Sequence, residues 1–109
     1  MIIQGSNLPI VITFDEDMSS LVDWSMSLFM EDKRTKEQTL LHHWGLHDIT
    51  IDGVTISAPL TEEETMSFPV GVATLEIKWL TQDEIIFHSD VIRIRIAGRN
   101  DTNKLIQNN

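Results

Sequence analysis

The sequence predicts an all-β protein, a two-sheet antiparallel sandwich of about seven strands with one short helix near residues 61–67. Three observations lead to this prediction. Apolar and polar residues alternate over several segments, an Asp-Gly pair separates two β-branched runs, and the only helical signal is short. With 109 residues the chain has room for one domain, which we place at residues 1–97.

The first half of the chain predicts three strands. One lies at about residues 8–14, and another covers the alternating segment from Val22 to Met30, whose apolar positions form one buried face. The next seven residues, Glu31 to Glu37, are all polar or charged, which predicts an exposed loop. A further strand is expected at 38–44.

A hairpin is the sharpest local prediction. Two β-branched runs, 49–51 and 54–56, flank Asp52-Gly53. Asp-Gly is favoured in tight hairpin turns because both central residues of a type I′ turn require positive φ. We therefore expect strands on either side of a turn centred on this pair.

The segment after the hairpin predicts a helix of little more than two turns. Thr61 and Glu64 have the spacing of a capping box, and acidic residues in the first turn favour the positive end of the helix dipole. Pro69 and Gly71 follow at once and end the helix.

Two more alternating segments complete the sandwich. One carries inward-facing Leu75, Ile77 and Trp79, and the other carries the isoleucines of residues 92–96. The apolar positions of 85–91 have the opposite parity, which predicts a bulge near Val91-Ile92 or a strand that crosses to the other sheet. Residues 98–109 are polar, and we predict a flexible tail.

Charge and composition narrow the possible partners. Eight basic and 17 acidic residues give a net charge of −9, the wrong sign for nucleic acid or an anionic membrane surface. No apolar run approaches the ~20 residues that span a bilayer, and residues 1–6 lack the features of a signal peptide. We therefore expect synthesis in a cytoplasm. The absence of cysteine excludes disulfides, thiolate zinc sites and cysteine nucleophiles.

Neither metal nor catalytic chemistry is predicted. His42 and His43 would point to opposite faces of a strand, so only one of them could join His47 at a metal. The acidic run at residues 15–17 lacks the spacing of an EF-hand and is expected to be a solvated loop. His88-Ser89-Asp90 are strand neighbours, which alternate between faces, so we expect no enzyme and no cofactor.

The three tryptophans have different expected roles. Trp24 and Trp79 lie at apolar positions of their strands and are predicted to fill the core. Trp44 lies in the histidine-rich stretch 42–47 and is the candidate for a surface contact with a partner or a glycan.

Several of these segments also resemble a known group of proteins. The hairpin at 49–56, the acidic helix at 60–68, the strand ending in Trp79-Leu80 and the segment 89–94 are similar to small proteins of phages and prophages of Gram-positive bacteria. The opening residues 3–6 also resemble the start of those proteins, so the resemblance covers most of residues 3–97. The histidine-rich stretch and the excess acidity depart from it.

The resemblance implies an immunoglobulin-like sandwich encoded among virion structural genes of the tail or baseplate region. We expect the protein to be made in the host bacterial cytoplasm, and the resemblance leaves open whether it stays in the mature virion. It transfers no catalytic residue. The leading hypothesis is a non-enzymatic structural or accessory protein that contacts other virion subunits, or copies of itself, through sheet edges and faces. The alternatives are a carbohydrate-binding module that uses Trp44 and an acidic protein that mimics DNA, although Glu76 and Lys78 show that the charges are mixed.

Overall fold

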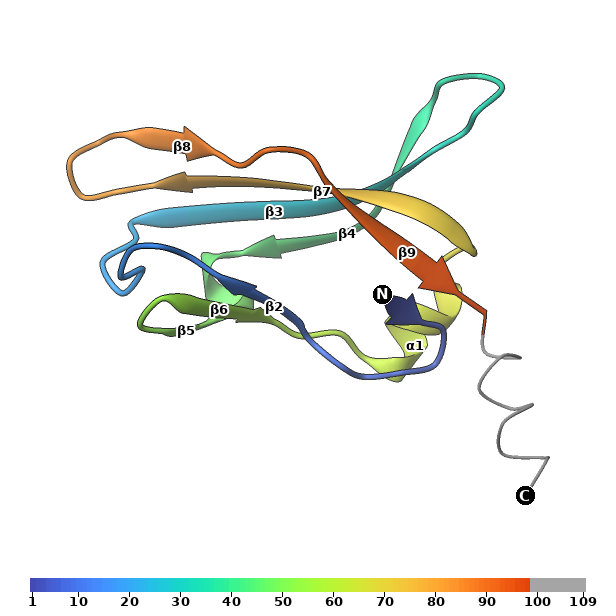
Figure 1. Ribbon diagram of the computed structural model, residues 1–109, viewed down its shortest axis with the longest axis horizontal. Helices are drawn as coiled ribbons and strands as arrows, with labels where there is room; N and C mark the ends of the chain where they lie inside the picture. Colours follow the sequence, from blue (N-terminus) through green and yellow to red (C-terminus); the bar gives the residue numbers. More distant parts are fainter. Residues whose placement is uncertain (99–109) are drawn as a thin grey trace.

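Two β-sheets face each other in the computed structural model, which describes residues 1–98 (Figure 1). The large sheet has the order β1 (Ile2–Ile3), β9 (Ile92–Ala97), β7 (Gly71–Leu80), β3 (Asp23–Glu31) and β4 (Gln38–Gly45), with β8 (Ile86–His88) also paired to β7. The small sheet has the order β2 (Ile10–Thr13), β6 (Thr55–Ala58) and β5 (Thr50–Asp52). The predicted all-β sandwich is confirmed.

The strand order is that of an immunoglobulin-like sandwich. In that fold, strands C, F and G form one sheet while B, E and D belong to the other. Here β3, β7 and β9 take the places of C, F and G, and β2, β6 and β5 those of B, E and D. All pairs are antiparallel except β1 with β9. The described residues form nine strands rather than about seven, because β1 and β8 are short additional segments.

The core lies between the sheets and follows the predicted alternation. Residues at even positions of β3 and odd positions of β7 point inward, and the small sheet covers them with Ile56 and Ala58 of β6. The inward residues of β3 and β7 that are buried are Trp24, Met26, Leu28, Ala73, Leu75 and Ile77. Removing such side chains from water is the main source of stability in a domain of this size.

The predicted hairpin is present, but its turn is displaced by one residue. Asp52 pairs with Thr55, so the two central turn residues are Gly53 and Val54 rather than Asp52 and Gly53. Gly53 has φ +60°, and Val54 does not have a positive φ. This is the φ pattern of a type II′ turn, which needs glycine only at its first central position.

Helix α1 (Glu62–Ser67) has the predicted capping box. The Thr61 hydroxyl accepts a hydrogen bond from the Glu64 backbone N–H at 3.1 Å, and the Glu64 carboxylate accepts one from the Thr61 N–H at 2.8 Å. These bonds satisfy donors that the first turn of a helix leaves unpaired. A 3₁₀ turn, η1 (Leu46–Asp48), follows β4.

Helix α1 also holds the N-terminal segment, which the sequence did not predict. The side chain of Thr65 is fully buried. Its hydroxyl accepts a hydrogen bond from the Gly5 N–H at 3.0 Å and donates one to the Ser6 carbonyl at 2.7 Å. Gln4 adds a bond from its amide to the Phe68 carbonyl at 2.6 Å. This contact joins residues about sixty positions apart in the chain.

The change of parity near residue 91 is a bulge, and the chain stays in the large sheet. Lys78 pairs with His88 and Leu75 with Ile92, so three steps along β7 match four steps along the opposite chain. Ser89 occupies the irregular position. Its N–H donates to the Ile77 carbonyl at 2.9 Å, and its hydroxyl accepts from the Ile77 N–H at 3.1 Å. The serine side chain therefore supplies an acceptor where the regular ladder is interrupted.

The predicted loop between β3 and β4 is confirmed, and all of its residues from 32 to 37 are exposed. The hairpin that carries it projects beyond the small sheet, at the upper right of Figure 1. The Asp32 carboxylate accepts a hydrogen bond from the Arg34 N–H at 2.8 Å, which stabilises the turn. Of the predicted polar tail at 98–109, residues 99–109 lie outside the described part of the chain.

Candidate interaction surfaces

Trp44 is not a surface residue, and this prediction was wrong. The indole is 1% exposed, because β4 places Trp44 opposite Met26 on the inner face of the large sheet. Its Nε1–H donates to the Pro59 carbonyl at 2.8 Å. A buried tryptophan commonly finds such a partner, and here the bond connects β4 to the segment before α1. The ring therefore offers no platform to a glycan or a partner.

The histidines of this stretch occupy different places. His42 points inward, where its Nδ1 lies 3.0 Å from the Glu64 carboxylate and its ring contacts Trp44 edge-on. His43 is on the outer face, with Nε2 3.0 Å from the Ser25 hydroxyl, and His47 lies in η1. The prediction that His42 and His43 face opposite ways is confirmed. Within residues 1–98, no three His, Cys, Asp or Glu side chains are grouped closely enough to hold a metal ion.

The acidic run at residues 15–17 is exposed, as predicted. The Asp17 carboxylate accepts hydrogen bonds from the Ser19 hydroxyl at 2.5 Å and from the Ser19 N–H at 2.9 Å. These two bonds, the hydroxyl bond foremost, lower the pKa of Asp17 below its ordinary value. The carboxylate is thus engaged in the local turn before β3.

A row of aromatic rings leads from the core to the surface at one end of the sandwich. Trp24 is 2% exposed, and Phe14 packs edge-on against both Trp24 and Trp79, with ring centroids 6.0 Å and 5.3 Å apart. Trp79 stacks on Phe87 of β8 at 5.5 Å, with the ring planes 13° apart. Phe87 is 40% exposed. The last ring is therefore both fixed in position and accessible.

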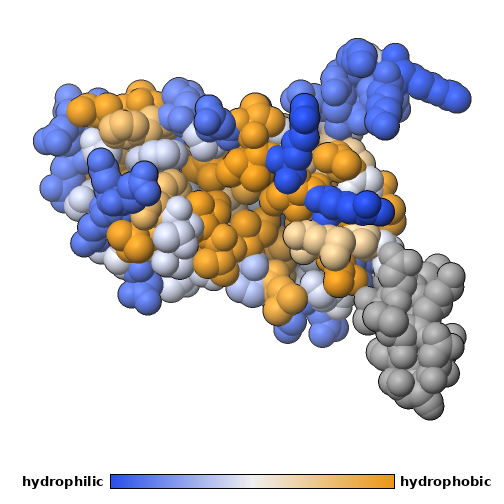
Figure 2. Space-filling model, viewed as in Figure 1, coloured by the Kyte–Doolittle hydropathy of each residue, from blue (hydrophilic) through white to orange (hydrophobic). Residues whose placement is uncertain are grey.

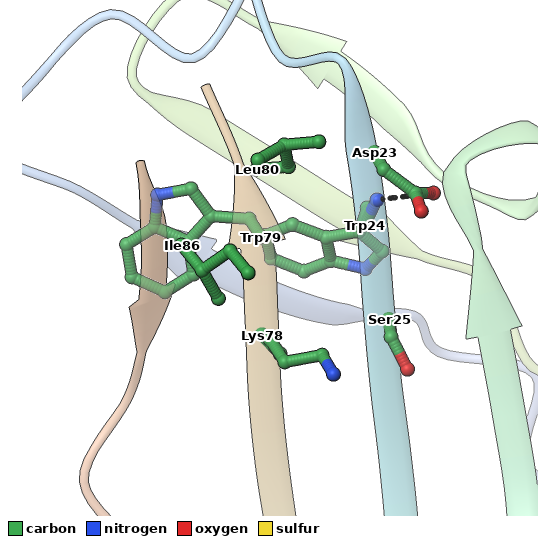
Figure 3. Close-up of a pocket in the computed structure, with 7 residues that line it drawn as sticks. All are labelled: Asp23, Trp24, Ser25, Lys78, Trp79, Leu80 and Ile86. Carbon is green, nitrogen blue, oxygen red and sulfur yellow. Dashed lines mark hydrogen bonds between the residues drawn. The ribbon is translucent and has the colours of Figure 1, made fainter. Parts of the chain in front are cut away.

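A shallow pocket lies on the outer face of the large sheet, where β3, β7 and β8 run next to one another (Figure 3). In that view the Trp24 and Trp79 rings lie side by side, with Leu80 and Ile86 nearby, and Lys78 extends toward Ser25. The pocket encloses about 170 Å³. Sites for small molecules usually measure about 300–1,000 Å³, so this pocket matches a single protruding side chain better than a free ligand.

The outer face of the large sheet carries a second, more polar groove next to this pocket. Its lining comes from β3, β7, the end of β8 and the bulge, and it shares Ser25 and Lys78 with the pocket. The Ser25–His43 pair lies on this open face. Ser89, by contrast, accepts a hydrogen bond from the Ile77 N–H of the sheet with its hydroxyl oxygen. The remaining lining residues are Ser27, Glu76, Ile77, His88, Ser89 and Val91.

The sandwich is open along one side, which sequence alternation did not reveal. Ile92 and Ile94 of β9 point inward as predicted but are only partly buried, as are Ile10 and Ile12 of β2. The small sheet ends at β2 and does not cover the inner face of β9. Figure 2 shows hydrophobic atoms across the middle of this side, between β9 and β2. The number of strands could have indicated this open side, because a small sheet of three strands cannot cover the whole inner face of the larger sheet.

Comparison with known protein families, with curated protein sequences and with solved structures finds no match to this chain. Among the described residues, no helix has the length and apolar character needed to cross a bilayer.

Proposed function

We propose that this chain is a non-enzymatic structural or accessory protein of a phage particle, from the tail or baseplate region, and that it works through protein–protein contacts. Two lines support the proposal. One is the resemblance of the hairpin, the acidic helix and the later strands to small phage and prophage proteins. The other is the immunoglobulin-like sandwich with apolar residues exposed on open sheet edges. The protein is made in the host cytoplasm and joins the virion there.

The observation that carries the proposal is strand β8. It pairs with β7 on one side only, and all three of its residues are exposed. Ile86 is 58% exposed, and Phe87 stacks on Trp79. An edge strand with no partner on its outer side and with fixed apolar side chains can bind another protein by pairing with one of its strands. The pocket on the outer face is lined by Ile86, so it offers a place for one apolar side chain of a partner next to this strand.

Substitution of Ile86 tests this role. Ile86→Glu changes an exposed side chain, so the fold should persist, while a charge enters the centre of the contact. Val70→Glu is the matched control, because Val70 is 59% exposed and lies outside the β8 surface. We expect purified particles to contain the wild-type chain and V70E but to lose I86E, measured by quantitative mass spectrometry. Infectious particles that never contain the wild-type chain would disprove the proposal.

The polar groove favours a second candidate function, a carbohydrate-binding accessory module for attachment to the host surface. Its Ser25, Ser27, Glu76 and His88 side chains offer hydroxyl, carboxylate and imidazole groups that can bond to sugar hydroxyls. Glu76→Gln should then weaken binding on a glycan array. No signal from the wild-type protein on a broad array would exclude this function.

A further inference from the structure

We propose that the open side of the sandwich binds an extended strand of a partner protein in which apolar residues alternate with acidic ones. The strand adds to the free edge of β9 and places its apolar side chains in the groove between β9 and β2. This inference rests on the proposed function, because it specifies a second contact of the same kind at a different place from β8.

Strand β1 covers only the end of β9, so the rest of this edge of β9 is free. The parallel pairing joins β1 only to Ile96 and Ala97. At this edge the Ala97 carbonyl accepts a hydrogen bond from the Gln4 N–H at 3.0 Å. Peptide groups alternate sides along a strand, so the N–H and C=O of Arg93 face the same edge. Arg93 lies beyond β1, and an added strand can pair with it.

The groove beside this edge is apolar on both walls. Ile92 and Ile94 form one wall and Ile10 and Ile12 the other, all of them partly buried. A cavity of about 210 Å³ lies where the N-terminal residues, β2 and Ile94 meet, and Leu8 contributes to its lining. Side chains of an added strand point alternately to the two faces of the sheet. Every second residue of the guest therefore enters the groove and should be apolar.

The charge of β9 indicates which residues the guest strand should carry on its outward-facing side. Arg93 and Arg95 are exposed on the outer face of β9, and neither forms an ion pair with any residue in the 1–98 region. They are two of only eight basic residues in a chain of net charge −9. The outward-facing residues of an added strand would lie beside them, where acidic side chains are favoured. A second copy of the chain is the less favoured guest, because its net charge of −9 repels the first copy.

The test uses a fluorescein-labelled synthetic peptide of about seven alternating isoleucine and glutamate residues, the usual length of a strand. Its control has lysine in place of glutamate. Fluorescence anisotropy with the whole protein should show saturable binding of the glutamate peptide and much weaker binding of the lysine peptide. In R93E/R95E the ratio of the affinities for the glutamate and lysine peptides should fall by about tenfold or more, so that the lysine peptide binds better. The reason is that two exposed charge pairs are reversed. Raising the salt concentration should reduce the difference.

A second variant tests the edge itself. Arg93→Pro removes the free N–H that the guest needs as well as one of the two charges, and Val72→Thr is a control on the outer face of the neighbouring strand. Loss of the charge alone would favour the lysine peptide, so weaker binding of both peptides by R93P identifies the missing N–H. Thermal unfolding first establishes that each variant is folded. Should R93P fail to fold, R93E/R95E alone decides the question.

Three results would overturn the inference. They are absence of peptide binding, equal binding of the two peptides, and concentration-dependent dimerisation that blocks the peptide, since the guest would then be a second copy. The β8 variant separates this inference from the proposed function. If I86E leaves the particle while the wild-type chain stays in it and binds neither peptide, the open side is not a strand-binding site, but the proposed function stands. If the wild-type chain is never in the particle, the proposed function fails instead.

Discussion

Replacing Thr65 by valine should destabilise the fold well beyond what one hydroxyl on a short helix suggests. The side chain is fully buried, and its hydroxyl bonds to the N–H of Gly5 and the carbonyl of Ser6. Valine has the same shape and fills the same space, so packing is preserved. Thr65→Val therefore removes the two hydrogen bonds that attach the N-terminal segment to α1, together with a longer one from the hydroxyl to the Glu62 carbonyl at 3.2 Å within the helix.

The magnitude follows from the groups left without partners. A buried donor or acceptor that loses its hydrogen bond costs about 1–3 kcal/mol in the free energy of unfolding. Gly5 and Ser6 are each only partly buried, and water reaches them in part. We therefore take the lower end for each group, about 2 kcal/mol in all. For a domain near this size, that corresponds to a fall in the melting temperature of roughly 8–16 °C.

Thermal and urea unfolding, followed by circular dichroism, measure this loss. Thr65→Ser is the matched control, because it keeps the hydroxyl and loses only a methyl group, so its cost should be about 1 kcal/mol. A T65V protein as stable as the wild type would refute the reasoning, because the hydroxyl would then contribute nothing to stability.

Three further predictions concern a pair of tryptophans, a turn glycine and an exposed carboxylate. Trp44→Phe should lower the free energy of unfolding more than Trp24→Phe does, and the difference between the two variants in urea unfolding should be about 1–2 kcal/mol. The reason is that the Trp44 N–H is hydrogen-bonded, whereas the buried Trp24 N–H has no partner. Gly53→Ala should lower the free energy of unfolding by about 1–2 kcal/mol in the same assay, because φ at this position is +60°. A Cβ at Gly53 would meet no other atom, so backbone strain is the only source of this cost, and an unchanged stability would contradict the turn geometry. The pKa of Asp17, titrated by NMR, should lie below the ordinary value and return toward it in Ser19→Ala. Because the folded-state pKa is lowered, the stabilisation by this carboxylate is present above the unfolded-state pKa and is lost as the pH falls through the folded value.

Local patterns predicted the parts of the structure that local physics determines. The capping box of Thr61 and Glu64 formed because both partners lie within one helical turn. Alternation also identified the inward residues of β3 and β7, since neighbouring side chains on a strand point to opposite faces. The Gly53 turn was placed one residue early because strand register selects the turn type, and register depends on packing across the small sheet.

Contacts between distant segments were not predictable in this way. Trp44 became a core residue because β4 joins the large sheet beside β3, a pairing that the composition of the histidine-rich stretch does not indicate. Ile92 and Ile94 have the pattern of buried positions, yet they remain partly exposed because the facing sheet ends at β2. The candidate surfaces depend on such features of sheet size and edge, so sequence reasoning reached the fold more completely than the site.

The bulge at Ser89 changes which positions along the chain point into the core. Upstream of it, the side chain that points inward is Phe87, and downstream it is Ile92, an odd position followed by an even one. Any insertion or deletion of a single residue elsewhere in β8 or β9 would turn every later side chain to the wrong face. The irregular backbone between β8 and β9 can instead absorb a change in chain length. A residue gained or lost there leaves the side chains of both strands on their correct faces.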